Sequence, residues 1–158
     1  MTARTDIETI ASDIETVLKT YLNTRLASIN AEKNDGLECL DVADAAYFFQ
    51  DLNDDLTNYD PFILYGVNAI VPQSDYGRCS QDITYSVTVI LADNAQDGLS
   101  KIMLRYGRAL KEIFEENWYL VNNGIKLKVN SLTPVDLEGL NTSTRYKAIG
   151  ITLEANIG

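Results

Sequence analysis

The chain contains no histidine among its 158 residues. Histidine is the commonest general base, the usual partner of a serine or cysteine nucleophile, and a frequent zinc ligand. Its absence excludes histidine-dependent triads and most zinc sites, whereas chemistry carried by carboxylates needs no histidine. The sequence also lacks GxGxxG and GxxxxGK[ST], so it has no recognisable phosphate-binding loop. We therefore expect no enzymatic activity and no cofactor.

Cysteine is almost as scarce. Cys39 and Cys79 are the only two, and neither belongs to a CxxC or CxxH arrangement. This spacing is typical of free thiols and not of a zinc site or a disulfide framework. The best metal candidate is the acidic run from Asp51 to Asp55, which begins like a calcium loop. That loop requires a glycine where this chain has Leu56 and a glutamate where it has Phe62, so we expect no metal and interpret the run as a solvated turn.

Basic residues are few relative to acidic ones. The chain has 13 Lys and Arg against 23 Asp and Glu, for a net charge of −10. Nucleic-acid binders neutralise phosphates with a basic surface, so this balance argues against a protein that grips DNA. It is compatible with a protein that lets DNA pass. Acidic proteins are common, however, and the charge alone does not decide between these interpretations.

Long apolar runs are also absent. No stretch approaches the roughly 20 apolar residues of a membrane span. Residues 1–6 are polar and no secretory apolar segment follows them. We expect no membrane association and a cytoplasm-like compartment.

The length and an apolar content of 46% predict one domain, residues 1–158, with one core. Apolar residues recur at steps of three and four from Ile7 to about Lys33, which predicts one long amphipathic helix. Thr5 or Asp6 is its expected N-cap, and Asn34-Asp35-Gly36 its stop signal. A second helix is predicted to begin near residues 94–97. Its apolar side would hold Leu99, Ile102, Met103, Tyr106, Leu110, Ile113, Phe114 and Trp118.

Four segments have the composition or alternation of strands. The clearest is Ile83 to Leu91, where apolar residues alternate with Thr and Ser. The others are residues 62–67, 125–129 and 149–153. Residues 72–80 and 133–144 are predicted to be polar loops. Residues 37–60 are harder to interpret, and residues 43–52 within them fit either a short helix or a strand.

This order predicts an α+β fold: a mainly antiparallel sheet of about four strands, flanked by the long N-terminal helix and the second helix. Two helices cover only one face of such a sheet. The second face, which we expect to carry Tyr and Thr, would remain partly bare. A bare face of this kind is often covered by another copy of the chain.

The polar side of the second helix carries four basic residues at steps of four, three and three. One hypothesis is a docking stripe for an acidic partner, such as another copy of this protein. The alternative is a solvated face whose bases pair locally, for example Lys111 with Glu115. Glu115 and Glu116 point about 100° apart on the helix, so they do not form a facing carboxylate pair. The stripe consists of Lys101, Arg105, Arg108 and Lys111.

Over its whole length the chain resembles the small tail-terminator and neck proteins of tailed bacteriophages, which join head to tail. The resemblance rests on element order and on five segments. These are the long N-terminal helix, the strands Phe62-Ile63-Leu64-Tyr65-Gly66-Val67 and Tyr85-Ser86-Val87-Thr88-Val89, the helix around Tyr106-Gly107-Arg108-Ala109-Leu110, and the last strand near residues 148–155.

The resemblance implies a structural virion protein without catalytic residues. Proteins of this kind form a ring, expected to be hexameric, that caps the tail tube, ends its polymerisation and joins it to the neck. They are assembled in the host cytoplasm, and DNA passes through the ring without specific binding. Ring contacts would fall on the two predicted loops as well as on the basic stripe. The candidate loop residues are Asp75, Tyr76, Arg78, Asp136 and Glu138.

Two alternatives remain open. One is another neck or tail-tube structural protein, which differs from a terminator only in its position and partners. The other is a small-ligand-binding or enzymatic α+β domain. That domain would be a monomer or dimer with a closed pocket and converging polar groups.

Overall fold

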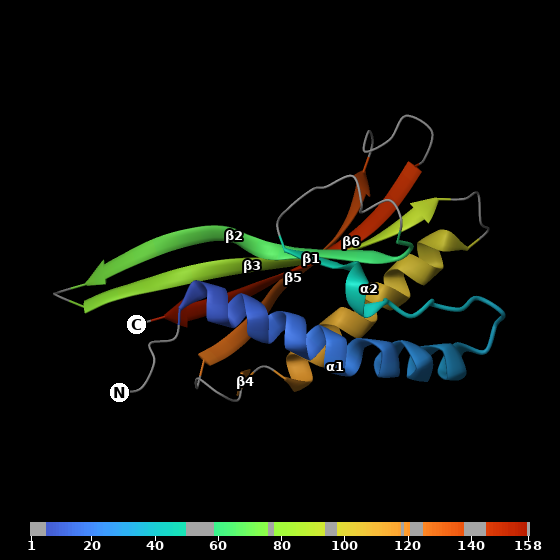
Figure 1. Cartoon of the computed structure of the whole chain (residues 1–158), viewed down its shortest axis with the longest axis horizontal. Coiled ribbons are helices and arrows are strands. Elements are labelled where there is room, and N and C mark those ends of the chain that lie inside the picture. Colours follow the sequence, from blue (N-terminus) through green and yellow to red (C-terminus); the bar gives the residue numbers. More distant parts are fainter. Residues whose placement is uncertain are drawn as a thin grey trace.

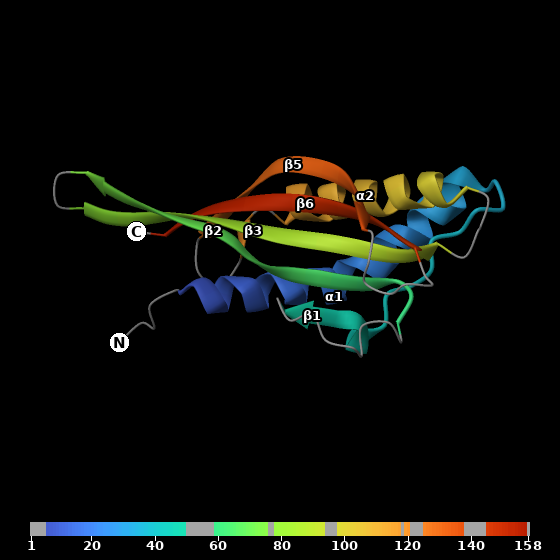
Figure 2. The same ribbon diagram turned by 90° about the horizontal axis from the view of Figure 1, so that it is seen from above.

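The computed structural model describes residues 6–49, 59–75, 78–93, 98–117, 119–120, 125–137 and 145–157. These residues form two layers, a twisted sheet and a pair of helices that cover one of its faces (Figures 1 and 2). The predicted α+β class is confirmed. Neither helix, within the described residues, is long and apolar enough to cross a membrane.

Helix α1 (Ile7–Lys33) has the predicted ends. Asp6 is its N-cap, and the Asp6 carboxylate accepts a hydrogen bond from the Thr9 amide at 2.7 Å. This bond satisfies one of the free amides of the first turn. The helix ends at Asn34, which adopts a left-handed conformation with φ of 44°. The side facing the sheet is buried at Ile10, Ala11, Ile14, Leu18, Leu22, Leu26 and Ile29.

The sheet has the strand order β1-β2-β3-β6-β5-β4. Its body is four long antiparallel strands, as predicted, and two short strands lie at its edges. The long strands are β2 (Phe62–Asp75), β3 (Arg78–Asp93), β5 (Ile125–Leu137) and β6 (Arg145–Ile157). The short ones are β1 (Tyr47–Phe49), which is parallel to β2, and β4 (Tyr119–Leu120). The ambiguous segment before residue 50 thus forms a 3-10 turn (Asp44–Ala46) followed by a strand.

Helix α2 (Leu99–Glu116) packs against β6 at Gly107. A Cβ atom at this position would overlap Ile149 Cδ1 and lie 3.3 Å from Leu132 Cδ2. Glycine therefore lets the helix backbone approach the sheet closely. The predicted apolar side of α2 is confirmed from Leu99 to Phe114, while Trp118 lies outside the described residues.

Buried and less buried side chains alternate along β3, as predicted. Ile83, Tyr85, Val87, Val89 and Leu91 are buried, and register places Val87 beside Ile151 of β6 and Tyr65 of β2. The prediction that Tyr side chains occupy the second face fails for Tyr65 and Tyr85 but holds for Tyr146. The hydroxyls of Tyr65 and Tyr85 bond Glu15 and the Ile7 carbonyl of α1, so both rings face the helices. The second face carries Thr and Ser opposite Gly150 and Thr152 of β6, and nearer the start of β6 it carries Tyr146, whose ring packs edge-on against Phe62.

The two predicted loops are also wrong where the structure describes them. Within residues 72–80, β2 continues to Asp75 and β3 begins at Arg78; within residues 133–144, β5 continues to Leu137. Pro72 and Pro134 misled the prediction, because proline cannot donate a ladder hydrogen bond. Both prolines stand where β2 and β5 have a single described neighbour, and proline is tolerated at such edge positions.

Candidate functional site

The described residues present surfaces that are candidates for contact with other molecules. Among the described residues, no three His, Cys, Asp or Glu side chains gather closely enough to hold a metal ion. The acidic run considered above, residues 51–55, lies outside the described residues. Four surfaces remain: a projecting hairpin, an apolar groove at its base, a basic groove between the helices, and an acidic segment beside α1.

The hairpin formed by β2 and β3 extends beyond both helices (Figures 1 and 2). We call residues 69–75 and 78–84 the arm. A bulge at Asn68 shifts the register where the arm begins. Ile70 and Val71 are 48% and 49% exposed although both are β-branched and apolar. Strand β6 accompanies β3 only as far as Gln81, so beyond this point the described arm has two strands.

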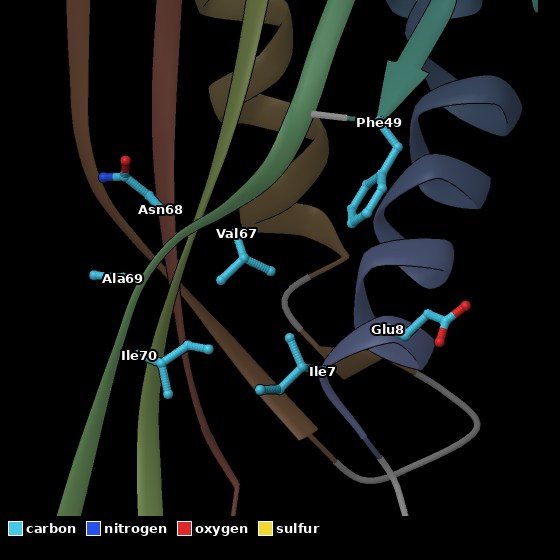
Figure 3. A pocket seen from close by; sticks show the side chains of 7 residues that line it. All are labelled: Ile7, Glu8, Phe49, Val67, Asn68, Ala69 and Ile70. Atoms are coloured by element: carbon cyan, nitrogen blue, oxygen red, sulfur yellow. The ribbon is translucent and has the colours of Figure 1, made fainter. Parts of the chain in front are cut away.

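A groove of about 600 Å³ lies at the base of the arm (Figure 3). Helix α1 forms one wall and β2 the other, and Phe49 closes the end next to β1. Because β1 pairs with β2 only at Ile63–Tyr65, the edge of β2 beyond this point has no described partner strand. The lining is mainly apolar and comprises Ile7, Glu8, Phe49, Val67, Asn68, Ala69 and Ile70.

Arg105 does not belong to a solvent-facing stripe, which corrects one prediction. Its side chain is only 7% exposed. The guanidinium donates to Asp35 Oδ1 at 3.1 Å and to the Leu37 carbonyl at 2.6 Å, and it forms an ion pair with Asp35. These hydrogen bonds lower the pKa of Asp35 to about 2 and raise that of Arg105. Arg105 therefore fixes the turn after α1 against α2.

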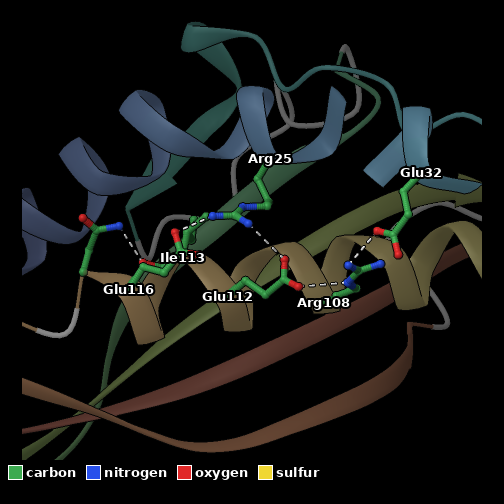
Figure 4. A network of polar contacts seen from close by, with 7 residues as sticks. Arg25, Glu32, Arg108, Glu112, Ile113 and Glu116 are labelled. Carbon is green, nitrogen blue, oxygen red and sulfur yellow. Dashed lines mark hydrogen bonds and ion pairs between the residues drawn. The ribbon is translucent and has the colours of Figure 1, made fainter. Parts of the chain in front are cut away.

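Arg108 is also engaged within the chain (Figure 4). It bridges Glu32 of α1 at 2.7 Å and Glu112 of α2 at 3.0 Å. Arg25 reaches from α1 to Glu112 and Glu116. This network joins the two helices. Helical spacing placed the four bases along one line but did not reveal that α1 supplies acidic partners beside it.

The local-pairing interpretation is confirmed at Lys111, which lies 3.3 Å from Glu115. Lys101 is exposed and forms no ion pair with a described residue. It lies on the rim of a groove of about 410 Å³ between α1 and α2. We call this the basic groove. Sequence spacing missed its members from α1 and the exposed Leu104. Its lining is Lys33, Asp35, Lys101, Leu104, Arg105 and Arg108.

Residues 37–43, the strap, run beside α1 in an extended conformation. The Asn30 amide accepts from the Cys39 N–H at 2.8 Å and donates to its carbonyl at 3.0 Å. Asn23 makes the same two bonds to Val42, at 2.9 and 3.0 Å. These two asparagines are two helical turns apart, the one sequence signal that could have indicated an element held along the helix. Cys39 is buried by this arrangement, which raises its thiol pKa to about 11.

The remaining candidate interface residues gain no structural support. Asp75, Arg78 and Asp136 lie in strand backbone, and Tyr76 and Glu138 lie outside the described residues. Their role at an interface stays a prediction. Compared with known protein families and with curated protein sequences, the chain matches none.

Proposed function

We propose that this protein is a structural subunit that assembles with copies of itself into a ring, and that the ring ends and joins the tail of a tailed bacteriophage. The arm is the observation that carries the self-assembly. The tip of the arm beyond Gln81 is a two-stranded ribbon, which is marginally stable in water, and beside it the three-stranded part of the arm exposes Ile70 and Val71. A neighbouring subunit that covered the arm would stabilise its two-stranded tip and bury its exposed apolar side chains.

The place in a phage tail rests on the resemblance in element order, and two further features support it. The acidic charge of −10 disfavours binding to DNA, as a passage for DNA requires. The fold presents different surfaces at its two ends, the arm at one and the basic groove at the other (Figure 1). Unlike surfaces favour head-to-tail contacts, which close into rings.

Light scattering coupled to size-exclusion chromatography, over a range of protein and salt concentrations, tests the assembly. We expect a mass near six subunits, and rings in electron micrographs of the same fractions. The variant Ile70→Asp with Val71→Asp is expected to reduce the mass while the circular dichroism spectrum stays unchanged. A monomer at every concentration would remove the self-assembly proposal.

The place in the tail needs a second test. A terminator added to growing tail tubes is expected to stop their elongation, and the arm variant is not. Another neck or tail-tube protein predicts a different outcome: open-ended tubes of this chain by itself, or no effect on tube length.

A further inference from the structure

We infer that the basic groove of one subunit receives the acidic strap of a second copy of this chain. The inference rests on the proposed self-assembly and assigns one of its contacts to named surfaces. It starts from the uneven distribution of charge. Between Lys33 and Arg78 the chain holds nine Asp and Glu residues and no Lys or Arg.

The strap is the described part of this stretch that is both acidic and exposed. Cys39 and Val42 are buried, whereas the residues beside and between them are exposed. The exposed set is acidic and surrounds Leu40, which is 59% exposed. The acidic members are Glu38, Asp41 and, in the following turn, Asp44.

The basic groove presents the complementary pattern. Lys33 and Lys101 are exposed and form no ion pair within the described part of the chain. The same groove is lined by Leu104, which is 55% exposed. Leu40 and Leu104 are the two most exposed large apolar side chains among the described residues. Each surface therefore combines one exposed leucine with charges that form no described ion pair, acidic on the strap and basic in the groove, where Asp35 is paired with Arg105.

The strap of the same subunit does not supply acidic partners to the lysines of this groove. Asn23 and Asn30 hold its backbone against α1, and the Tyr106 hydroxyl of α2 donates to the Leu40 carbonyl. The inner side is thus occupied, and the acidic side chains remain directed to solvent. A strap held in this way loses little conformational entropy on binding a neighbour. Opposite charges would guide the encounter, and burial of the two leucines would add an apolar contact.

Charge reversal on each surface tests the inference. The groove variant is Lys33→Glu with Lys101→Glu, and the strap variant is Asp41→Lys with Asp44→Lys. These positions are exposed and make no described ion pair, so we expect both variants to fold. Each alone is expected to weaken assembly about tenfold or more, because like charges then meet. An equimolar mixture of the two is expected to recover assembly, since each groove then meets a strap of opposite charge.

The control is Lys19→Glu with Lys128→Glu, which changes the net charge as much as the groove variant at exposed positions outside both surfaces and also removes the ion pair of Lys19 with Glu15. It is expected to leave the assembly mass unchanged. If the parent chain forms a ring and neither surface variant alters it, the ring stands and this contact is wrong. If both variants fall apart but their mixture stays dissociated, charge complementarity between the two surfaces is refuted. A parent chain that is monomeric throughout removes both the ring and this contact.

Discussion

Replacement of Asn30 by alanine is expected to release one end of the strap from α1. The Asn30 amide holds both the N–H and the carbonyl of Cys39, at 2.8 and 3.0 Å. Alanine provides neither partner. Cys39 lies behind these bonds and is buried, so its thiol becomes accessible only when the strap opens.

The magnitude follows from the two bonds. Each neutral hydrogen bond contributes about 1 kcal/mol, so strap opening becomes easier by about 2 kcal/mol. A difference of that size makes the open state about thirtyfold more populated. Global unfolding is expected to change less, because alanine is a better helix former than asparagine by roughly 0.5 kcal/mol in α1. That gain persists when the strap opens locally and is lost only when the helix unfolds.

Thiol labelling with Ellman's reagent measures the opening. The background is Cys79→Ser, so Cys39 is the only thiol. Burial raises the pKa of Cys39 to about 11, and the thiolate is the reactive form, so the closed state is protected near pH 8. We expect labelling of Asn30→Ala about thirtyfold faster than the parent, with urea unfolding lowered by only about 1.5 kcal/mol.

Thr20→Ala is the matched control. The Thr20 hydroxyl donates only to the Thr16 carbonyl of α1, so its loss leaves the strap bonds intact. Its labelling rate is expected to equal that of the parent. Equal rates for Asn30→Ala and the parent would refute the argument, because the asparagine would then contribute nothing to the position of the strap.

Three further predictions concern the fold. Val87→Asp buries an unpaired charge in the central strand and is expected to cost several kcal/mol, whereas Thr88→Asp on the second face costs far less; soluble yield and circular dichroism separate them. Asp35 has its pKa lowered to about 2, so its ion pair stabilises the fold above about pH 4 and is lost as pH falls toward 2. The stability difference between the parent and Asp35→Asn should therefore shrink over that interval in urea melts, and a constant difference would contradict the electrostatic origin. Gly107→Val is expected to destabilise the protein by about 1–3 kcal/mol in the same assay, despite valine's better helix propensity, because its side chain overlaps Ile149; an unchanged midpoint would show that the two layers can separate there.

Local signals in the sequence were sufficient for the main elements. The three- and four-residue spacing of α1, its cap at Asp6 and its stop at Asn34 depend on neighbours within one or two turns. The alternation around Val87 likewise identified the buried face of β3. The loops failed because proline is a local signal, whereas its tolerance in β2 and β5 depends on which strands lie beside them.

The candidate surfaces depended on contacts that the sequence does not encode locally. The composition determined that the chain is acidic and without histidine, and the helical period placed Lys101, Arg105, Arg108 and Lys111 near one side of α2. Only the tertiary structure decided that Arg105 turns inward to Asp35 and that Arg108 joins α1. These partners are distant in the chain, and each ion pair forms because the packing of α1 on α2 brings opposite charges together.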